Sequence, residues 1–541
     1  MSKGNINKYL DKITRAEDWI SDKIDVWENI YKLYMGIKKQ GMRGRSNLHI
    51  PVTFISVNTV ATRLIYSLFN TPPYVRVLPM NSMAIEESKF AEKLLNYYLG
   101  QKEHFHKYYM YVVNELLYDI GAMKIIPYKN GKYLSFKLEV VNPWDLFFDV
   151  DAPSLEDMTF VGHRKEVHIS YIKGKIKKGE FKRVDVKKLT GGAEDSGYNV
   201  YERQEPSPLP KNPDYVELVE IIDVVEKKRI VLGNRRAILL EEDFTDPLPY
   251  VLMNCYPIPG RLKGLSDGEL IRDLQKEINA KRNQRLDNVN RILNQMFFVK
   301  IGSIQNLERL ANPVPGGVIF GTEKPEPLVV PDLTSNLILE EERPFRDIER
   351  ALGVYDIVRG ETSRKRESAT EVLTASQNAN MRFWLKTRFL ETGFILELAD
   401  KMLRFLVKYG GKMVVKMRSN EFREITPRDI NPDNLMFEAV ASSQVENTQI
   451  RRNQVILLFT QLLKMFPELV NKQGMAEYLV DLFDIKEKDK ILNIMEEEQT
   501  LTEKQHALSL ADILRNATNL NPPGMQGIPM PPITKIGGEG E

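Results

Sequence analysis

The feature that most constrains the fold is a long helix with a polar middle. In the stretch GLSDGELIRDLQKEINAKRNQRLDNVNRILNQ, Ser266 and Glu269 have the spacing of a capping box, and a helical pattern follows them. Such a helix is about 40 Å long. Between residues 279 and 288 its apolar side chains are Ala280 and Leu286, among several lysine and arginine residues. A helix this polar is not a buried core helix, so we expect it to bridge domains or to lie beside copies of itself.

The chain before this helix predicts an α+β region. Apolar and aromatic residues recur at helical spacing over residues 6–37 and 85–119, which predicts amphipathic helices. Two β-rich pairs of segments surround Asn130-Gly131 and Gly233-Asn234, whose residues tolerate positive φ, so we expect two β-hairpins. Residues 173–214 show no sustained period, and we expect a surface excursion there instead of a regular element.

The chain after the long helix predicts one small module and more helices. Residues 296–333 are β-like and rich in proline, and they are too few to hold an independent core. A shorter helix is expected over about residues 336–352. Ser368 and Glu371 repeat the capping-box spacing and should begin a helix that reaches about Lys408. This helix would be about 60 Å long, a length that suits the axis of a large assembly.

The composition excludes several classes of protein. The chain has 541 residues, 42% of them hydrophobic and 28% charged, and a formal net charge of +2, so overall charge predicts no tight, nonspecific grip on nucleic acid. A single cysteine, Cys255, allows no intrachain disulfide and no thiolate zinc cage. The N-terminus lacks the apolar core of a signal peptide. Apolar runs such as residues 455–463 are too short for a bilayer, so we expect no membrane insertion.

Few residues suggest catalysis. The sequence contains no phosphate-binding loop and no nucleophile elbow, and the histidines, including His104 and His163, lack a metal-binding pattern. One alternative is a metal-dependent nucleic-acid-processing enzyme that uses the cluster Asp149, Asp151 and Asp157. Carboxylates of this kind more often form turns and caps. We therefore expect no enzyme activity, no cofactor and no bound metal.

Taken in order, three patches resemble a tailed bacteriophage portal protein, the head-to-tail connector. The first comprises RSNLHIPVTFISVNTVATRLIYSLFNTPPYVRVLP and NPWDLFFDVDAPSLEDMTFVGHR, which resemble segments of the family's wing. The second, GLSDGELIRDLQKEINAKRNQ, is similar to a stem helix. The third, ALGVYDIVRGETSRKRESATEV, is similar to the end of the stem, the tunnel loop and the start of a long helix. The order of the second and third patches makes the resemblance specific.

The resemblance implies a ring subunit of α+β class with an α/β wing, a helical stem, a small β clip and a helical crown. The implied parts follow the chain in this order: the N-terminal part of the wing, 1–264; stem helix 1, 265–295; the clip, 296–333; stem helix 2, 334–352; the tunnel loop, 353–369; the long helix and return to the wing, 370–440; the crown, 441–520; and a disordered tail, 521–541.

The resemblance also implies a function and partners. Family members form a ring, usually of twelve subunits, at a unique capsid vertex, through which double-stranded DNA is packaged and ejected. The implied protein partners are the terminase large subunit, an adaptor or head-completion protein, tail proteins, and the major capsid and scaffolding proteins. The implied location is the virion, with the host cytoplasm during assembly.

The resemblance implies that two groups of cations are candidate DNA contacts. The expected tunnel-loop residues are Arg359, Arg364, Lys365 and Arg366. The candidate channel-facing residues of the stem are Lys276, Lys281, Arg282 and Arg285. Over residues 359–367, four cations and the two carboxylates Glu361 and Glu367 give a local charge of +2, and a ring would multiply it into a positive collar. DNA should meet this collar through its phosphates, without base reading.

Overall fold

The structure is a computed structural model, and it divides the chain into two compact units, Met1–Asn447 and Thr448–Glu541. It describes residues 3–38, 41, 44–70, 72–131, 133–153, 157–185, 189, 214–259, 264–305, 307–311, 315–316, 318–353, 383–418, 421–440, 448–466, 475–476 and 478–480. The second unit contains helix α12, Thr448–Met465.

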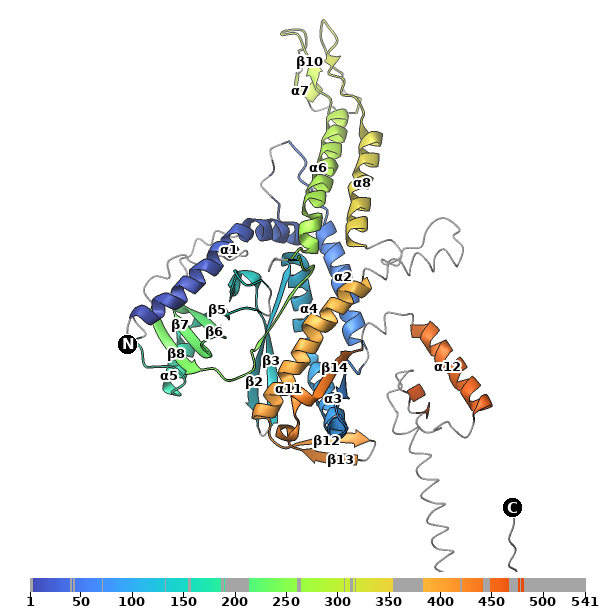
Figure 1. Ribbon diagram of the computed structural model, residues 1–541. Coiled ribbons are helices and arrows are strands. Elements are labelled where there is room, and N and C mark those ends of the chain that lie inside the picture. The colour runs from blue at the N-terminus through green and yellow to red at the C-terminus, as the bar shows by residue number, and fades with distance from the viewer. Residues whose placement is uncertain are drawn as a thin grey trace, which may run out of the picture. The chain divides into compact units, whose positions relative to one another are not determined.

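The first unit combines helices with antiparallel sheets (Figure 1). Its helices are α1 Lys3–Met35, α2 Val52–Phe69, α3 Ile85–Leu99, α4 Lys102–Tyr118, α5 Ile169–Lys177, α6 Asp267–Leu293, α7 Leu307–Ala311, α8 Thr334–Leu352 and α11 Glu397–Tyr409. Residues 383–390 are also helical and lead through a π-helical turn, Glu391–Leu396, into α11. The coarse α+β expectation is confirmed.

The strands form two main sheets and three small pairs. The larger sheet has the order β4-β5-β6-β7-β8 and the smaller one β3-β2-β9, and every strand pairing is antiparallel. Their bounds are β2 Ile120–Asn130, β3 Tyr133–Val140, β4 Leu146–Phe148, β5 Phe160–His168, β6 Tyr215–Asp223, β7 Lys228–Gly233, β8 Ala237–Asp243 and β9 Tyr250–Asn254. The small pairs are β1 Val75–Pro79 with β14 Leu435–Ala439, β10 Phe297–Phe298 with β11 Glu326–Pro327, and β12 Met413–Arg418 with β13 Glu421–Ile425.

Both expected hairpins are confirmed. Strands β2 and β3 meet at a turn in which Gly131 has φ 64°, and strands β7 and β8 meet at a turn in which Asn234 and Arg235 have φ 42° and 56°. These residues occupy the left-handed region that such turns need.

The prediction of an irregular excursion over residues 173–214 is wrong at its start. Residues 173–177 belong to α5, and Ile172 of this helix is buried with Leu189 against strands of the larger sheet. Apolar residues at 169, 172 and 176 give this short helix a packed face, but lysines at 173, 175, 177 and 178 obscured the pattern. Residues 190–213 lie outside the described part of the chain.

Helix α2 corrects the statement about apolar runs. Among the described residues it has the length and composition of a membrane-crossing helix, with 18 residues and a mean hydropathy of 1.3, and half of it is buried. Its buried residues include Val57, Val60, Ala61 and Leu64, and Thr53 is hydrogen-bonded to Gln275 of α6. These contacts are those of a core helix inside the first unit.

An aromatic cluster joins helices to the sheets in the core. Trp27 of α1 lies edge-on to Tyr118 of α4, with ring centroids 6.3 Å apart, and Tyr118 lies edge-on to Trp144 at 5.2 Å. All three side chains are almost completely buried. Edge-to-face contacts of this kind add to the stabilisation from burial itself.

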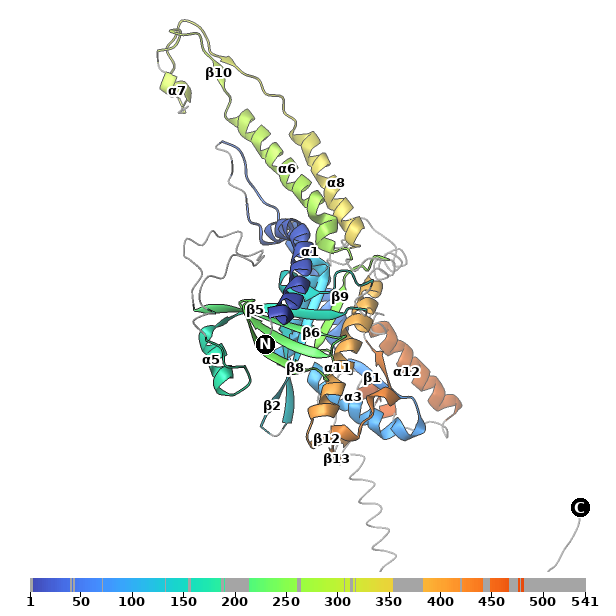
Figure 2. The same cartoon turned by 60° about the vertical axis from the view of Figure 1, so that its left-hand side comes forward.

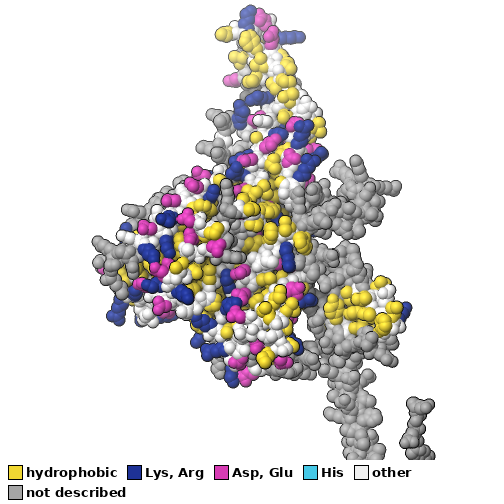
Figure 3. All heavy atoms as spheres, in the orientation of Figure 1, with side chains coloured by type: hydrophobic (Ala, Val, Ile, Leu, Met, Phe, Trp, Pro, Cys, Tyr) yellow, Lys and Arg dark blue, Asp and Glu magenta, His cyan; other side chains and the backbone are white. Residues whose placement is uncertain are grey.

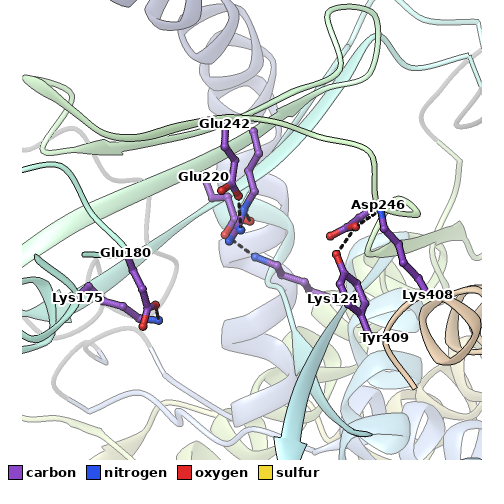
Figure 4. A network of polar contacts seen from close by, with 9 residues as sticks. Lys124, Lys175, Glu180, Glu220, Glu242, Asp246, Lys408 and Tyr409 are labelled. Carbon is purple, nitrogen blue, oxygen red and sulfur yellow. Dashed lines mark hydrogen bonds and ion pairs between the residues drawn. The ribbon is translucent and has the colours of Figure 1, made fainter. Parts of the chain in front are cut away.

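A polar network links the two main sheets (Figure 4). Lys124 of β2 donates to Glu220 of β6 at 2.5 Å, and the second oxygen of Glu220 accepts from Arg229 of β7 at 3.0 Å. Burial by itself would raise the pKa of Glu220, but the charges of Lys124 and Arg229 outweigh it and lower this pKa from 4.5 to about 2. Nearby, Lys408 and Tyr409 of α11 bond Asp246, which follows β8, at 2.5 Å each.

We predict that Glu220→Gln lowers the free energy of unfolding by about 3–5 kcal/mol at pH 7, because Lys124 loses its buried counter-charge. Since the folded pKa of Glu220 is lowered, its contribution is complete above its ordinary pKa of 4.5 and is lost as the pH falls toward 2. Urea unfolding at several pH values measures both effects.

The matched control is Glu180→Gln, which breaks an exposed ion pair with Lys175, also drawn in Figure 4. We expect this variant to unfold like the wild-type chain. Equal stability of the two variants would show that the Glu220 network does not hold the sheets together.

Candidate functional site

The base of α6 is fixed by hydrogen bonds to α4. The Ser266 hydroxyl accepts from the Glu269 amide at 3.0 Å, which confirms the expected cap, and donates to the Leu117 carbonyl at 3.0 Å. The Gly264 amide donates to Asp119 at 2.6 Å. A Cβ at Gly264 would lie 2.4 Å from Asp119, so the close approach requires glycine here.

A buried ion pair ties the first residue of α6 to the helix of residues 383–390. Lys386 lies 2.5 Å from Asp267, and the two side chains are 6% and 0% exposed. Burial by itself lowers the pKa of Lys386, but the neighbouring groups, among which Asp267 acts most strongly, together outweigh burial and raise this pKa. The lysine therefore stays charged and connects two elements that are 119 residues apart.

One stripe of α6 binds a segment of backbone. Four side chains spaced four residues apart form this stripe: Gln275, Asn279, Asn283 and Asp287. Their oxygens accept, in the same order, from the amides of Thr53 (2.9 Å), Ile50 (3.0 Å), Leu48 (2.6 Å) and Ser46 (2.6 Å). We call the four side chains the amide ladder and residues 44–51 the strap.

From Asn279 to Asp287 the ladder works because two repeats have nearly equal lengths. Four helical residues advance by about 6 Å, and two residues of extended chain advance by about 6.6 Å. Gln275 and Asn283 also donate to the carbonyls of Ile50 (2.7 Å) and Leu48 (3.0 Å). The polar middle of α6 is thus satisfied partly inside its own chain.

A second stripe of α6 binds α8, which runs beside it in both views (Figures 1 and 2). Lys281 donates to the carbonyl of Glu340 at 3.0 Å, while Arg282 and Arg285 both bond Glu341, Arg285 at 3.1 Å. Glu341 is 5% exposed. Three of the four candidate stem cations therefore lie against α8.

The fourth candidate stem cation, Lys276, has a different position. Its side chain is 48% exposed and lies 3.2 Å from Asp273 of the same helix. The orientation of all four cations toward a channel stays a prediction. The structure separates Lys276 from the three that pair with α8.

The far end of the α6–α8 pair carries a small module with an apolar surface. Strands β10 and β11 have two residues each, and all four are exposed. Hydrophobic side chains gather on this module (Figure 3), among them Phe298, Ile301, Phe320, Leu328 and Val329. Ile301 and Val329 are 102% and 81% exposed. A patch of this kind marks an interaction surface.

The expected tunnel loop lies almost entirely outside the described residues. This holds for Arg359, Arg364, Lys365, Arg366 and the cap at Ser368. The described chain resumes at residue 383, in the helix that carries Lys386.

The carboxylate cluster forms a turn. Asp149 accepts from the Thr159 hydroxyl at 2.5 Å and from the Asp151 amide at 3.3 Å, and Asp151 lies 3.7 Å from Arg15. Across the described ranges, no group of three or more His, Cys, Asp or Glu residues could hold a metal ion. The turn-forming interpretation is confirmed for Asp149, and the geometry does not support the enzyme alternative.

Two buried histidines, His104 and His163, make hydrogen-bond contacts inside the fold. Both ring nitrogens of buried His104 face backbone carbonyl oxygens, that of Tyr98 at 3.1 Å and that of Phe136 at 3.0 Å. His163 bonds the Tyr250 hydroxyl at 2.7 Å, and burial lowers its pKa to about 4. Both histidines therefore have hydrogen-bond partners within the fold.

Comparison with known proteins identifies the class. A family model described as phage SU10 portal protein matches residues 112–511, well over half of the chain. The chain therefore belongs to the phage SU10 portal protein family. At the level of this family it is a structural component of a capsid-associated oligomeric ring in the virion, and not an enzyme.

Two further comparisons add little to this assignment. A chain from the virion of a native gene transfer agent particle aligns with 11% sequence identity and a TM-score of 0.39, over 83% of this chain and 92% of that chain. No curated protein sequence matches the chain.

We predict that Asn279→Leu loosens the strap, because it removes the oxygen that accepts from the Ile50 amide and from Gln275, and the amide group that bonds His49. A lost buried hydrogen bond costs about 1–3 kcal/mol, so the Ile50 amide should exchange with solvent roughly tenfold faster or more. Hydrogen–deuterium exchange of a peptide that covers the strap measures this rate.

Gln284→Ala is the matched control, since Gln284 is an exposed residue near the same turn of α6. In this variant the amide hydrogens of the strap should exchange with solvent at the wild-type rate. Unchanged exchange in Asn279→Leu would contradict a role of the amide ladder in holding the strap.

Proposed function

We propose that this chain is the subunit of a ring, of about twelve copies by analogy with the family, that forms the DNA channel at a unique capsid vertex. In this role it passes double-stranded DNA during packaging and ejection. It docks the terminase large subunit first and head-completion, adaptor and tail proteins later, and it contacts the major capsid and scaffolding proteins. Assembly of the ring takes place in the host cytoplasm.

The apolar module at the end of α6 and α8 carries the proposal. Its large side chains, such as Phe298 and Ile301, are exposed in the single chain, and its two-residue strands cannot bury them. Copies of the same module around a ring would cover each other and complete this core. The polar helix pair would hold these modules at a fixed distance from the sheets.

The parts of a portal subunit are assigned on this basis. The wing comprises residues 1–264 with 370–440, the stem comprises α6 and α8 within 265–295 and 334–352, and the clip is 296–333. The tunnel loop is 353–369 and the crown is 441–520. The paired helices with a small module between them support this assignment.

The DNA contact would be electrostatic. Arg359, Arg364, Lys365 and Arg366 give residues 359–367 of each tunnel loop a local charge of +2, after Glu361 and Glu367 are subtracted. A ring sums these charges, and phosphates would meet them without sequence preference. Weak contact for each subunit suits a conduit, because tight binding would stop transport.

We predict that the purified wild-type chain forms closed rings in negative-stain microscopy. Combining Phe298→Asp with Ile301→Asp should leave the subunit folded and reduce the ring population strongly, because charges enter the surface between copies. Met83→Asp is the control, since Met83 is 90% exposed on another part of the first unit. The proposal is contradicted if the wild-type chain gives only monomers or small dimers in negative-stain microscopy under all conditions.

We also predict that replacing Arg364, Lys365 and Arg366 with alanine leaves rings intact and alters DNA packaging or retention, because the loop loses its positive charge. Packaged DNA per particle, measured by nuclease protection, reports the effect. If the triple variant fails to fold, as judged by circular dichroism, the loop is structural instead.

A further inference from the structure

We propose that an arginine stripe on α8 binds an acidic stripe on α6 of the neighbouring copy in the ring. Arg346 and Arg350 would pair with Glu277 and Asp273 of the next subunit. The inference rests on the proposed function, in which α6 and α8 run along the ring axis as its stem.

The arginine stripe lies on the side of α8 that is turned away from α6. The buried residues Glu341, Pro344, Ile348 and Leu352 define the side that faces α6. Each arginine of the stripe, Arg343, Arg346 and Arg350, lies two residues along the chain from one of these buried residues. Two residues correspond to a rotation of about 200° around the helix axis, so the arginines lie on the opposite side of α8. Their side chains are 73%, 68% and 73% exposed.

The acidic stripe lies on the third side of α6. Asp273, Glu277, Ala280 and Gln284 recur at helical spacing, and all four residues are exposed. The side chains of Asp273 and Glu277 are 70% and 44% exposed. The strap covers a second side of α6, and α8 covers the remaining one. Small Ala280 lets another helix approach closely.

The two stripes lie at the same height along the helix pair. The helices are antiparallel, and Glu341 meets Arg282 and Arg285. The contact of Glu341 with Arg282 and Arg285 sets a common reference level, and each residue advances by about 1.5 Å along the helix axis. Measured along this axis, Arg346 lies within roughly 3 Å of the level of Glu277, and Arg350 within roughly 3 Å of the level of Asp273. Rotation about an axis along the helices keeps every height, so opposite charges of adjacent copies meet.

A neighbouring protein surface fits these arginines better than DNA does. Helix α8 carries five carboxylates and three arginines, a net charge of −2 from 3 − 5, and a helix of this sign does not attract a polyanion. Glu342 and Asp347 lie beside the stripe, 3.3 Å from Arg346 and 3.5 Å from Arg350. Such alternating charge suits the rim of an interface between proteins.

The test exchanges the charges of the two stripes. One variant combines Arg346→Glu with Arg350→Glu, a second combines Asp273→Lys with Glu277→Lys, and a third carries all four substitutions. Each two-residue variant should need roughly tenfold more protein for half-maximal ring assembly, because like charges then meet at every interface. The four-residue variant should assemble like the wild-type chain.

Mixing the two reversed variants in equal amounts should also restore rings, with the two chains in alternation. The control is Arg343→Glu, an equally exposed arginine whose level on α6 is near Ala280, and it should assemble nearly as well as the wild-type chain. Circular dichroism and analytical ultracentrifugation check folding and assembly. The inference is overturned if the two-residue variants assemble normally, or if folded four-residue chains do not.

Normal rings that lose DNA in the Arg346 and Arg350 variant would assign these arginines to phosphates and overturn the inference while the proposed function stands. Absence of rings from the wild-type chain under all conditions would instead overturn the proposed function, and this inference with it.

Discussion

The amide ladder of α6 is the interaction on which the rest of the first unit depends. Isolated polar helices gain little from burial, and α6 projects away from the sheets (Figure 2). The ladder replaces a hydrophobic face with directed hydrogen bonds to the backbone of the strap. Because the bonds involve backbone amides at Ser46, Leu48 and Ile50, they fix the register of the strap against α6. The strap then leads directly into α2, a helix of the core.

The other sides of α6 are also held by polar contacts and not by a hydrophobic face. Ion pairs with Glu340 and Glu341 hold α8, and the Lys386–Asp267 pair holds the base of α6 to the helix that leads into α11. The polar side chains of α6 in these ion pairs therefore have partners within the chain. Apolar surface is concentrated instead on the module between α6 and α8, where copies of the subunit would meet.

The sequence predicted the features that local chemistry decides. The Ser266 cap and the turn at Gly131 depend on a few adjacent residues, so spacing was sufficient to find them. It did not predict what satisfies the polar middle of α6, because the strap lies more than 220 residues away in the chain. The four-residue spacing of Gln275, Asn279, Asn283 and Asp287 was a visible signal of this face. Their partners are backbone groups, which leave no mark in the sequence.

The same limit applies to the cations of α6. The pattern of Lys281, Arg282 and Arg285 is compatible both with a DNA channel and with a pair of helices. The sequence could not distinguish the two, because Glu340 and Glu341 become neighbours of these cations only in the folded chain. Exposed arginines of the pair are found on α8, at Arg343, Arg346 and Arg350.

A cryo-electron microscopy reconstruction of the assembled protein, at a resolution that shows side chains, tests the central claim most directly. The account predicts closed rings in which α6 keeps the strap and α8 on two of its sides and receives α8 of the adjacent subunit on the third. Arg346 and Arg350 should then lie within about 4 Å of the adjacent subunit's Glu277 and Asp273, the distance of an ion pair. A reconstruction in which the third side of α6 faces solvent, or in which the strap has left the amide ladder, would contradict it.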